Sequence, residues 1–288
     1  MKLGKINKQS IAATTFTSVL NNIPVPPKCL YIAGKVPETR RPTVAIVGSR
    51  KPTAYGEEVT HKLAYDLAKQ GVVIVSGLAF GIDVIAHKAA LEAGGTTIAV
   101  LANGLHRVYP SSHANIAEQI IKNSGALISE KAQGHEAMRH DFLARNRLIS
   151  GLADAVIVTE ATERSGTLST VGHALDQNKD VFAVPGPINS LLSAGSNRIL
   201  QEGAHICLSA QDVLDVIAPN LKPIQTKLVL GDTELENRII KLIQNGEHDG
   251  DKLHTRSKVS QSEFLQALTM MELKGTLKNT GGNKWSTK

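Results

Sequence analysis

Short, continuous runs of apolar residues alternate with amphipathic stretches through the middle of the chain. The runs are VAIVG (44–48), VVIVSG (72–77), TTIAVLANG (96–104), ALISE (126–130), AVIVTEA (155–161) and DVFAVPG (180–186). Continuous apolar strands, as opposed to strictly alternating ones, are typical of a parallel sheet covered by helices on both faces. The pattern therefore predicts an α/β fold with an extended Rossmann-like, doubly wound and mostly parallel sheet over residues 43–217.

The sequences on either side of this block have a different pattern. Residues 1–42 include a proline-rich, extended stretch, and we interpret them as an N-terminal extension. Residues 218–233 contain two prolines and no clear period, which is typical of a linker. Residues 234–288 show three stretches with helical spacing and then a strand–turn–strand pattern around Gly281 and Gly282. These last residues predict a small C-terminal winged-helix domain.

Composition restricts the function classes without naming one. The chain has 288 residues and a net charge of +6, which is compatible with an acidic partner but not diagnostic. Cys29 and Cys207 have no paired spacing, so neither a disulfide framework nor a cysteine-based zinc site is expected. No apolar run is long enough to span a membrane, and the N-terminus lacks the apolar core of a secretory signal. We expect a cytoplasmic protein without a cofactor, a metal or a membrane partner.

The loops after the predicted strands hold the candidate chemistry, because ligands of open α/β sheets bind at the carboxyl ends of the strands. Glycine, serine and arginine gather there, and their backbone N–H groups and guanidinium groups can bind phosphate. The candidates are Ser49, Arg50, Ser76, Gly77, Phe80, Gly81, Phe142, Arg145, Arg147, Ser165, Gly166 and Thr167. A row of anion sites suits a polyanion, and Phe80 and Phe142 could stack bases, so single-stranded nucleic acid is the favoured ligand.

Structural roles compete with these assignments. Asp83 could be the N-cap of its helix, and His87 is expected to be exposed or satisfied. Arg145 and Arg147 lie two apart at an expected helix start, so they should diverge, and either could pair with a carboxylate.

Three carboxylates, those of Glu130, Asp154 and Glu160, lie at or near strand ends, where they could act as general acids or bases. Capping and pairing with arginine is the favoured interpretation. We therefore expect no catalytic residue and no enzyme.

The same segments resemble the family of DNA-processing protein A, known as DprA or Smf. The matching motifs lie within residues 44–208 and are VAIVGSRKPTAYG, VSGLAFGIDVIAHKAALEAGGTTIAVLANGLHRVYP, GALISE, RNRLISGLADAVIVTEA, SGTLSTVGHALDQNKDVFAVPGPI and SAGSNRILQEGAHI. The resemblance implies a homodimer that binds incoming single-stranded DNA during natural transformation and loads the recombinase RecA onto it. It also adds Gly48 and Asn146 to the implied DNA-binding residues.

Three positions depart from the family pattern: Phe80 stands in place of arginine, Leu143 in place of proline and His113 in place of asparagine. Two alternative functions remain open at this point. One is a nucleotide-processing enzyme of the phosphoribohydrolase type, although ATERSGTLST lacks the paired glycines and the final glutamate of that motif. The other is a protein-binding adaptor with a vestigial DNA pocket.

Overall fold

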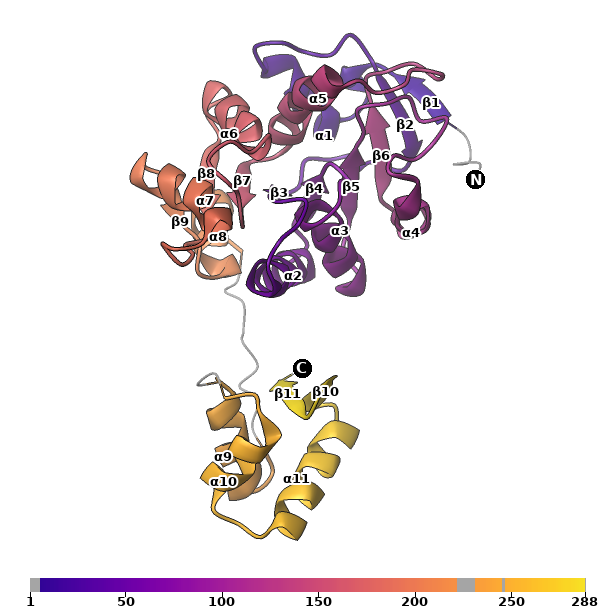
Figure 1. Cartoon of the computed structure of the whole chain (residues 1–288). Coiled ribbons are helices and arrows are strands. Elements are labelled where there is room, and N and C mark those ends of the chain that lie inside the picture. The colour runs from indigo at the N-terminus through magenta and orange to yellow at the C-terminus, as the bar shows by residue number, and fades with distance from the viewer. Residues whose placement is uncertain (1–5, 222–230, 245–246, 288) are drawn as a thin grey trace. The chain divides into compact units, whose positions relative to one another are not determined.

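The computed structural model of the chain describes residues 6–221, 231–244 and 247–287 (Figure 1). The chain divides into two compact units, Met1–Ile224 and Gln225–Lys288. Within the described residues, no helix is both long enough and apolar enough to cross a membrane.

A sheet in the order β1-β2-β6-β5-β4-β3-β7-β8-β9 forms the centre of the first unit. Its strands are β1 (Ile6–Gln9), β2 (Leu30–Gly34), β3 (Thr43–Val47), β4 (Val73–Ser76), β5 (Thr97–Val100), β6 (Ala126–Ser129), β7 (Ala155–Val158), β8 (Asp180–Ala183) and β9 (His205–Ile206). The strands from β6 to β9 in this order are parallel, whereas β2 pairs antiparallel with β6 and with β1. The predicted α/β, mostly parallel fold is confirmed.

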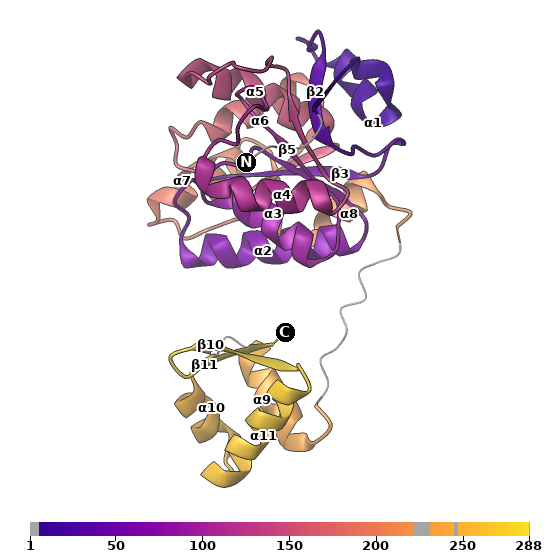
Figure 2. The same cartoon turned by 90° about the vertical axis from the view of Figure 1, so that its right-hand side faces the viewer.

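Helices cover both faces of the sheet, as the views in Figures 1 and 2 show. They are α1 (Thr15–Ser18), α2 (Ala54–Lys69), α3 (Ile82–Glu92), α4 (Ala114–Lys122), α5 (Arg139–Leu152), α6 (Thr167–Asp176), α7 (Leu191–Gln201) and α8 (Ala210–Ile217). Short 3-10 turns occupy Ile11–Ala13, Val19–Asn22 and Ser111–His113. Apolar residues of α2, α3 and α8 pack on one face, and those of α1, α5, α6 and α7 pack on the other. The sheet is therefore doubly wound.

The N-terminal residues are part of this domain, which differs from the predicted boundary at residue 43. Strand β2 adds to the sheet beside β6, with Tyr31 opposite Ser129. Phe16 and Leu20 are fully buried in the same core cluster as the β2 residue Ile32. The boundary differs because an antiparallel strand can join a parallel sheet from a distant part of the sequence. The predicted linker, 218–233, lies partly outside the described residues.

The second unit contains α9 (Glu234–Gln244), α10 (Gly250–Ser257), α11 (Gln261–Leu273), β10 (Leu277–Gly281) and β11 (Lys284–Thr287). The two strands form an antiparallel hairpin. Ile239, Leu253, Phe264 and Trp285 belong to a separate hydrophobic core. Three helices followed by a hairpin are the element order that the sequence predicts for a winged helix.

Candidate nucleic-acid interface

Three of the predicted loops meet where the strand order reverses, between β3 and β7. The Thr167 hydroxyl donates a hydrogen bond to the Gly48 carbonyl oxygen at 3.0 Å. The amide of Ser49 donates to the Glu160 carbonyl oxygen at 2.7 Å, and the amide of Ile82 donates to the Ser49 carbonyl oxygen at 3.1 Å. Reversal points of this kind are where open α/β sheets bind ligands. The structure therefore joins the turn after β3, the start of α3 and the start of α6 in one place.

Glycine is required where the turn after β3 approaches the turn before α3. Gly81 has a φ of +72°, and a Cβ on it would lie 2.3 Å from the Ser49 carbonyl oxygen. A Cβ on Gly48 would lie 2.7 Å from Cγ1 of Ile82. Both distances are too short for any side chain. These two predicted site residues therefore act by allowing the loops to pack closely.

Asp83 does not cap helix α3, so the N-cap interpretation is wrong. The N-cap residue is Gly81, and the Asp83 carboxylate turns back to accept hydrogen bonds from the amides of Gly77 and Ala79, at 3.1 and 3.3 Å. Burial raises the pKa of Asp83, and the charge of Arg145 opposes that effect. Because its partner is inside the protein, the Gly77 amide is not available to a phosphate.

Arg145 lies in the middle of α5 and not at a helix start, because the helix begins at Arg139. Its Nη1 donates to the carbonyl oxygen of Gly77 at 2.9 Å and to that of Val100. The residue is only 5% exposed, and burial lowers its pKa to about 10. Arg145 therefore stabilises the loops through buried hydrogen bonds and does not present a free cation to a ligand.

Arg147 points away from Arg145, as the sequence predicts, and is held in an ion pair. Its two terminal nitrogens bond to the two carboxylate oxygens of Glu130 at 3.1 and 2.6 Å, and its Nε donates to the Val25 carbonyl oxygen. A bidentate pair of this kind is geometrically specific and holds the side chain in place. The structural interpretation of Arg147 and Glu130 is confirmed.

The other two strand-end carboxylates also have structural partners. Asp154 accepts from the Arg40 guanidinium and from the Thr43 amide. Glu160 is buried and accepts from both the amide and the hydroxyl of Thr53, the N-cap residue of α2. Capping and pairing therefore account for these side chains.

Two further residues singled out from the sequence lie in the interior. Ser76 is fully buried, and its hydroxyl donates to the Ile46 carbonyl oxygen at 2.7 Å. His87 is also fully buried, with Nδ1 2.6 Å from the Thr97 hydroxyl and Nε2 without a partner among the described residues. Burial lowers the pKa of His87 to about 3. The expectation that His87 is exposed is therefore wrong. The alternative expectation, that its hydrogen-bonding groups have partners, holds for Nδ1 but, among the described residues, not for Nε2.

The loop at the start of α6 is fixed by its own side chains and by α5. The Ser165 hydroxyl donates to the Thr167 hydroxyl at 2.9 Å, and its oxygen accepts from the Thr167 amide. The Asn146 side-chain amide donates to the Ser169 hydroxyl at 2.8 Å. Gly166 is exposed between these contacts. Asn146, Ser165 and Thr167 therefore fix the shape of the loop. Gly166 is the part of its backbone that is exposed to solvent.

An exposed cation and three aromatic rings form the accessible part of the site. Arg50 is exposed, and its Cζ lies 5.8 Å from the centre of the Phe142 ring. The Tyr109 ring packs on the same Phe142 ring at 5.7 Å between centroids. Phe80 and Tyr109 are each 50% exposed. Among the described residues Arg50 has no ion-pair partner, so the surface combines a free guanidinium with exposed rings.

Tyr109 is a member of this surface that the sequence-based site does not include. It follows β5 in the segment ANGLHRVYP, and an aromatic residue after a strand end is the signal that could identify it. Its direction cannot be predicted from the sequence, because it lies well beyond the end of β5 in a segment without a regular period. The structure places it beside Phe142, so it joins the site.

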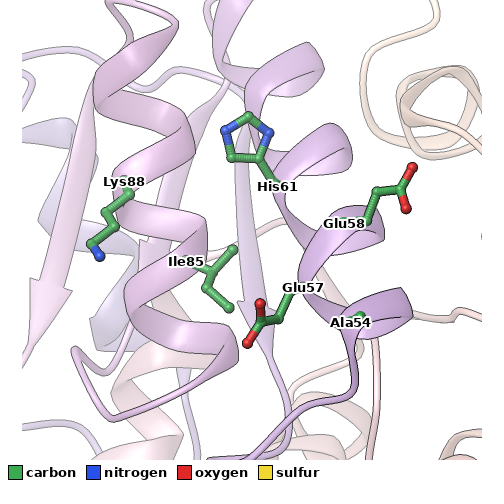
Figure 3. A pocket seen from close by; sticks show the side chains of 6 residues that line it. All are labelled: Ala54, Glu57, Glu58, His61, Ile85 and Lys88. Carbon is green, nitrogen blue, oxygen red and sulfur yellow. The ribbon is translucent and has the colours of Figure 1, made fainter. Parts of the chain in front are cut away.

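A separate groove lies between α2 and α3, with a volume of about 390 Å³. Figure 3 shows its lining: Ala54, Glu57, Glu58, His61, Ile85 and Lys88. None of the predicted site residues lines it. Within the described residues, no group of three or more acidic, histidine or cysteine side chains could hold a metal ion.

Comparisons with known proteins agree on one family. Residues 9–218 match the family model of DNA recombination-mediator protein A. The DNA processing protein DprA of Bacillus subtilis is 37% identical over 211 residues, which are 73% of this chain and 71% of that protein. Protein Smf of Escherichia coli is 41% identical over 189 residues, 66% of this chain. The chain spans only 50% of the length of that relative.

Solved structures show the same similarity. DNA processing protein A of Streptococcus pneumoniae aligns with a TM-score of 0.68 and 39% identity, over 75% of this chain and 76% of that one. DNA processing protein A of Helicobacter pylori, whose single-stranded DNA binding mode has been described, aligns with a TM-score of 0.67 and 31% identity, over 77% of this chain and 100% of that one. With a family model matching residues 9–218 and relatives of this similarity, the chain belongs to the DNA recombination-mediator protein A family.

Proposed function

We propose that this chain binds single-stranded DNA at the carboxyl edge of its sheet and does not act on it as an enzyme. The observation that carries the proposal is the exposed Arg50 guanidinium packed on the Phe142 ring, with Tyr109 on the same ring. Sites for single strands combine positive charge with aromatic stacking surfaces. The Helicobacter pylori relative, described in a single-stranded DNA binding mode, supports the same ligand.

Preference for single strands over duplex follows from the exposed rings. Phe80 and Tyr109 are half exposed, and each could stack on a base only if that base is unstacked from its neighbours. Bases in a duplex are already stacked and paired. Arg50 would contact the phosphates of either form, so it contributes affinity without this selectivity.

Family membership supports the wider role that we include in the proposal. The bound strand would be protected and passed to a RecA-type recombinase, and the chain would act as a homodimer in the cytoplasm. The description of the family as a recombination mediator supports this sequence of events. Because the chain spans half of the Escherichia coli relative, these partners are proposals for this chain.

The test is fluorescence anisotropy with a labelled oligo-dT and its duplex counterpart, over a series of salt concentrations. We expect tighter binding to the single strand and a steep loss of affinity with salt, because bound cations of the DNA are released. Arg50→Glu should weaken binding about 10-fold through a lost contact and added repulsion. Lys122→Glu is the matched control, since it makes the same charge change on α4, near the amino end of β6.

Four outcomes would contradict the proposal. Flat salt dependence, or equal affinities of wild type and Arg50→Glu, would remove phosphate contacts at this edge as the source of binding. Absence of binding at low salt, with capture of a protein partner in DNA-free conditions, would favour the adaptor function. Release of free base from a nucleotide would favour the phosphoribohydrolase function.

A further inference from the structure

We propose that His113 is a positioning residue that holds the Phe80 ring as a stacking platform for a nucleobase. The inference rests on the proposed function and deepens it. To base stacking by Phe80 it adds the residue that orients this ring after the end of β4.

The turn that carries Phe80 is held in an uncommon conformation. Leu78 has a φ of 57°, which a branched side chain adopts rarely and keeps only when its surroundings hold it. Its side chain is fully buried, and the amides on both sides, those of Gly77 and Ala79, bond to the Asp83 carboxylate. The turn is therefore fixed from inside the protein, and the ring two residues later leaves it in a set direction.

His113 also contacts this turn. Its Nδ1 lies 2.9 Å from the Leu78 carbonyl oxygen. A carbonyl oxygen only accepts, so Nδ1 carries the proton, and the bond fixes both the tautomer and the plane of the imidazole ring. The residue is only 9% exposed, so neighbouring atoms surround the ring on most sides.

The oriented imidazole then packs against Phe80. The two ring centroids are 4.9 Å apart and the ring planes meet at 67°, the edge-to-face arrangement that aromatic pairs favour. The contact leaves 50% of Phe80 exposed to solvent. The Phe80 ring thus contacts the His113 imidazole on one side and solvent elsewhere. Such a half-exposed apolar ring is suited to a flat apolar ligand such as a base.

A second ring is supported by the same segment of chain. Residues 103–113 carry both His113 and Tyr109, and Tyr109 packs on Phe142. The Asn103 side-chain amide donates to the Arg107 carbonyl oxygen at 2.9 Å, which closes this segment on itself. The segment therefore supports exposed aromatic surface at two places, as a run of neighbouring bases would require.

The test compares oligo-dT with an abasic oligomer that has the same number of phosphates, at one fixed salt concentration. We expect wild type to bind oligo-dT about 5- to 100-fold more tightly than the abasic oligomer. Phe80→Ala should lower this ratio several-fold while leaving affinity for the abasic oligomer unchanged, and Phe80→Tyr should retain the ratio. His113→Asn and His113→Ala should lower the ratio in the same way as Phe80→Ala.

His61, which lines the groove of Figure 3, offers a matched control. Its ring stacks on the ring of Tyr65, with the two centroids 6.1 Å apart. His61→Ala removes a histidine from an aromatic neighbour in a groove that none of the predicted site residues lines, and it should leave the ratio unchanged. Should His113→Ala fail to fold, photocrosslinking of wild type to an oligomer with 4-thiothymidine gives a second measurement. Crosslinks at Phe80 are expected.

The outcomes separate this inference from the proposed function. If neither oligomer binds, the proposed function fails. If both bind equally, phosphate binding stands and the platform is refuted. A His113 variant that loses affinity for both oligomers alike would show a purely structural role, and crosslinks only at other residues would also refute the platform.

Discussion

The buried carboxylate of Glu160, which follows β7, holds Thr53 at the start of α2 through two hydrogen bonds. Its Oε2 accepts from the Thr53 amide at 2.8 Å and its Oε1 from the Thr53 hydroxyl at 2.6 Å. The Thr53 hydroxyl oxygen in turn accepts from the Gly56 amide, as an N-cap does. The two halves of the doubly wound sheet are thus joined beside the binding edge by one carboxylate.

Replacing this carboxylate should destabilise the protein. Glu160→Ala leaves the Thr53 amide and hydroxyl without their acceptor, so we expect the free energy of unfolding to fall by about 2–3 kcal/mol. Thermal unfolding measures the change. Glu57→Ala removes an exposed carboxylate from the first turn of α2 and serves as the control. A loss no larger than that of the control would mean that the Glu160 contacts contribute little.

Gly77 is a position where even a methyl group should be disruptive. A Cβ there would lie 2.7 Å from Oδ2 of Asp83 and 2.8 Å from Cζ of Arg145, and both neighbours are buried. We expect Gly77→Ala to lower the free energy of unfolding by about 1–3 kcal/mol and to weaken DNA binding, because the turn carrying Phe80 must shift. Chemical denaturation and anisotropy report the two effects.

Gly172→Ala is the comparison for that variant. Gly172 lies in helix α6, and among the residues that the structure describes, no atom outside its own helix and its chain neighbours lies within 4 Å of the position that a Cβ would take. Alanine should therefore be neutral there or stabilise the helix by up to about 1 kcal/mol. Equal stability of the Gly77 and Gly172 variants would show that the turn is more adaptable than its contacts indicate.

His87 should make stability depend on pH in the mildly acidic range. Its pKa is about 3 in the folded protein, mainly because of burial, whereas an unfolded histidine has a pKa of about 6.5. The unfolded state therefore binds the proton first as the pH falls. Stability is fully present above about pH 6.5 and is lost on acidification towards pH 3, by about 2 kcal/mol between pH 7 and pH 5.

Urea denaturation at pH 7 and pH 5 measures this loss. His87→Gln removes the titrating group, so the difference between the two pH values should shrink by about 2 kcal/mol in that variant. A His87 variant with an unchanged pH dependence would assign the acid sensitivity to other groups.

The sheet can be predicted from the sequence because its parallel strands are buried on both faces. Runs such as those around Ile46, Ile74 and Ile157 are continuously apolar and are fully buried in the structure. Strand β2 is harder to predict because LYIAG is isolated between prolines and its partner β6 is far along the chain. The pattern of residues within a short segment gives no information about which distant strand it pairs with.

The site can be predicted as a region but not residue by residue. The order of strands in the sequence correctly predicts that the loops after them lie together, because parallel strands have their carboxyl ends at the same edge of the sheet. It cannot show that the Asp83 carboxylate accepts a hydrogen bond from the Gly77 amide, or that Arg145 donates one to the Gly77 carbonyl oxygen. Both contacts depend on the loop folding back on itself. The start of α5 is missed for a simpler reason: its N-cap is Met138, which is not a residue that typically marks a helix start.

The pairing of β2 with β6 has a consequence for folding during synthesis. Tyr31 cannot reach its partner Ser129 until the intervening strands and helices have left the ribosome. Until then, β2 can pair only with β1, and Leu30 and Ile32, both buried in the complete sheet, lack the core neighbours that lie later in the chain. An apolar strand with one open edge is a site where nascent chains can associate with one another. Completing the sheet therefore requires that β2 be kept from such contacts while the rest of the domain is made.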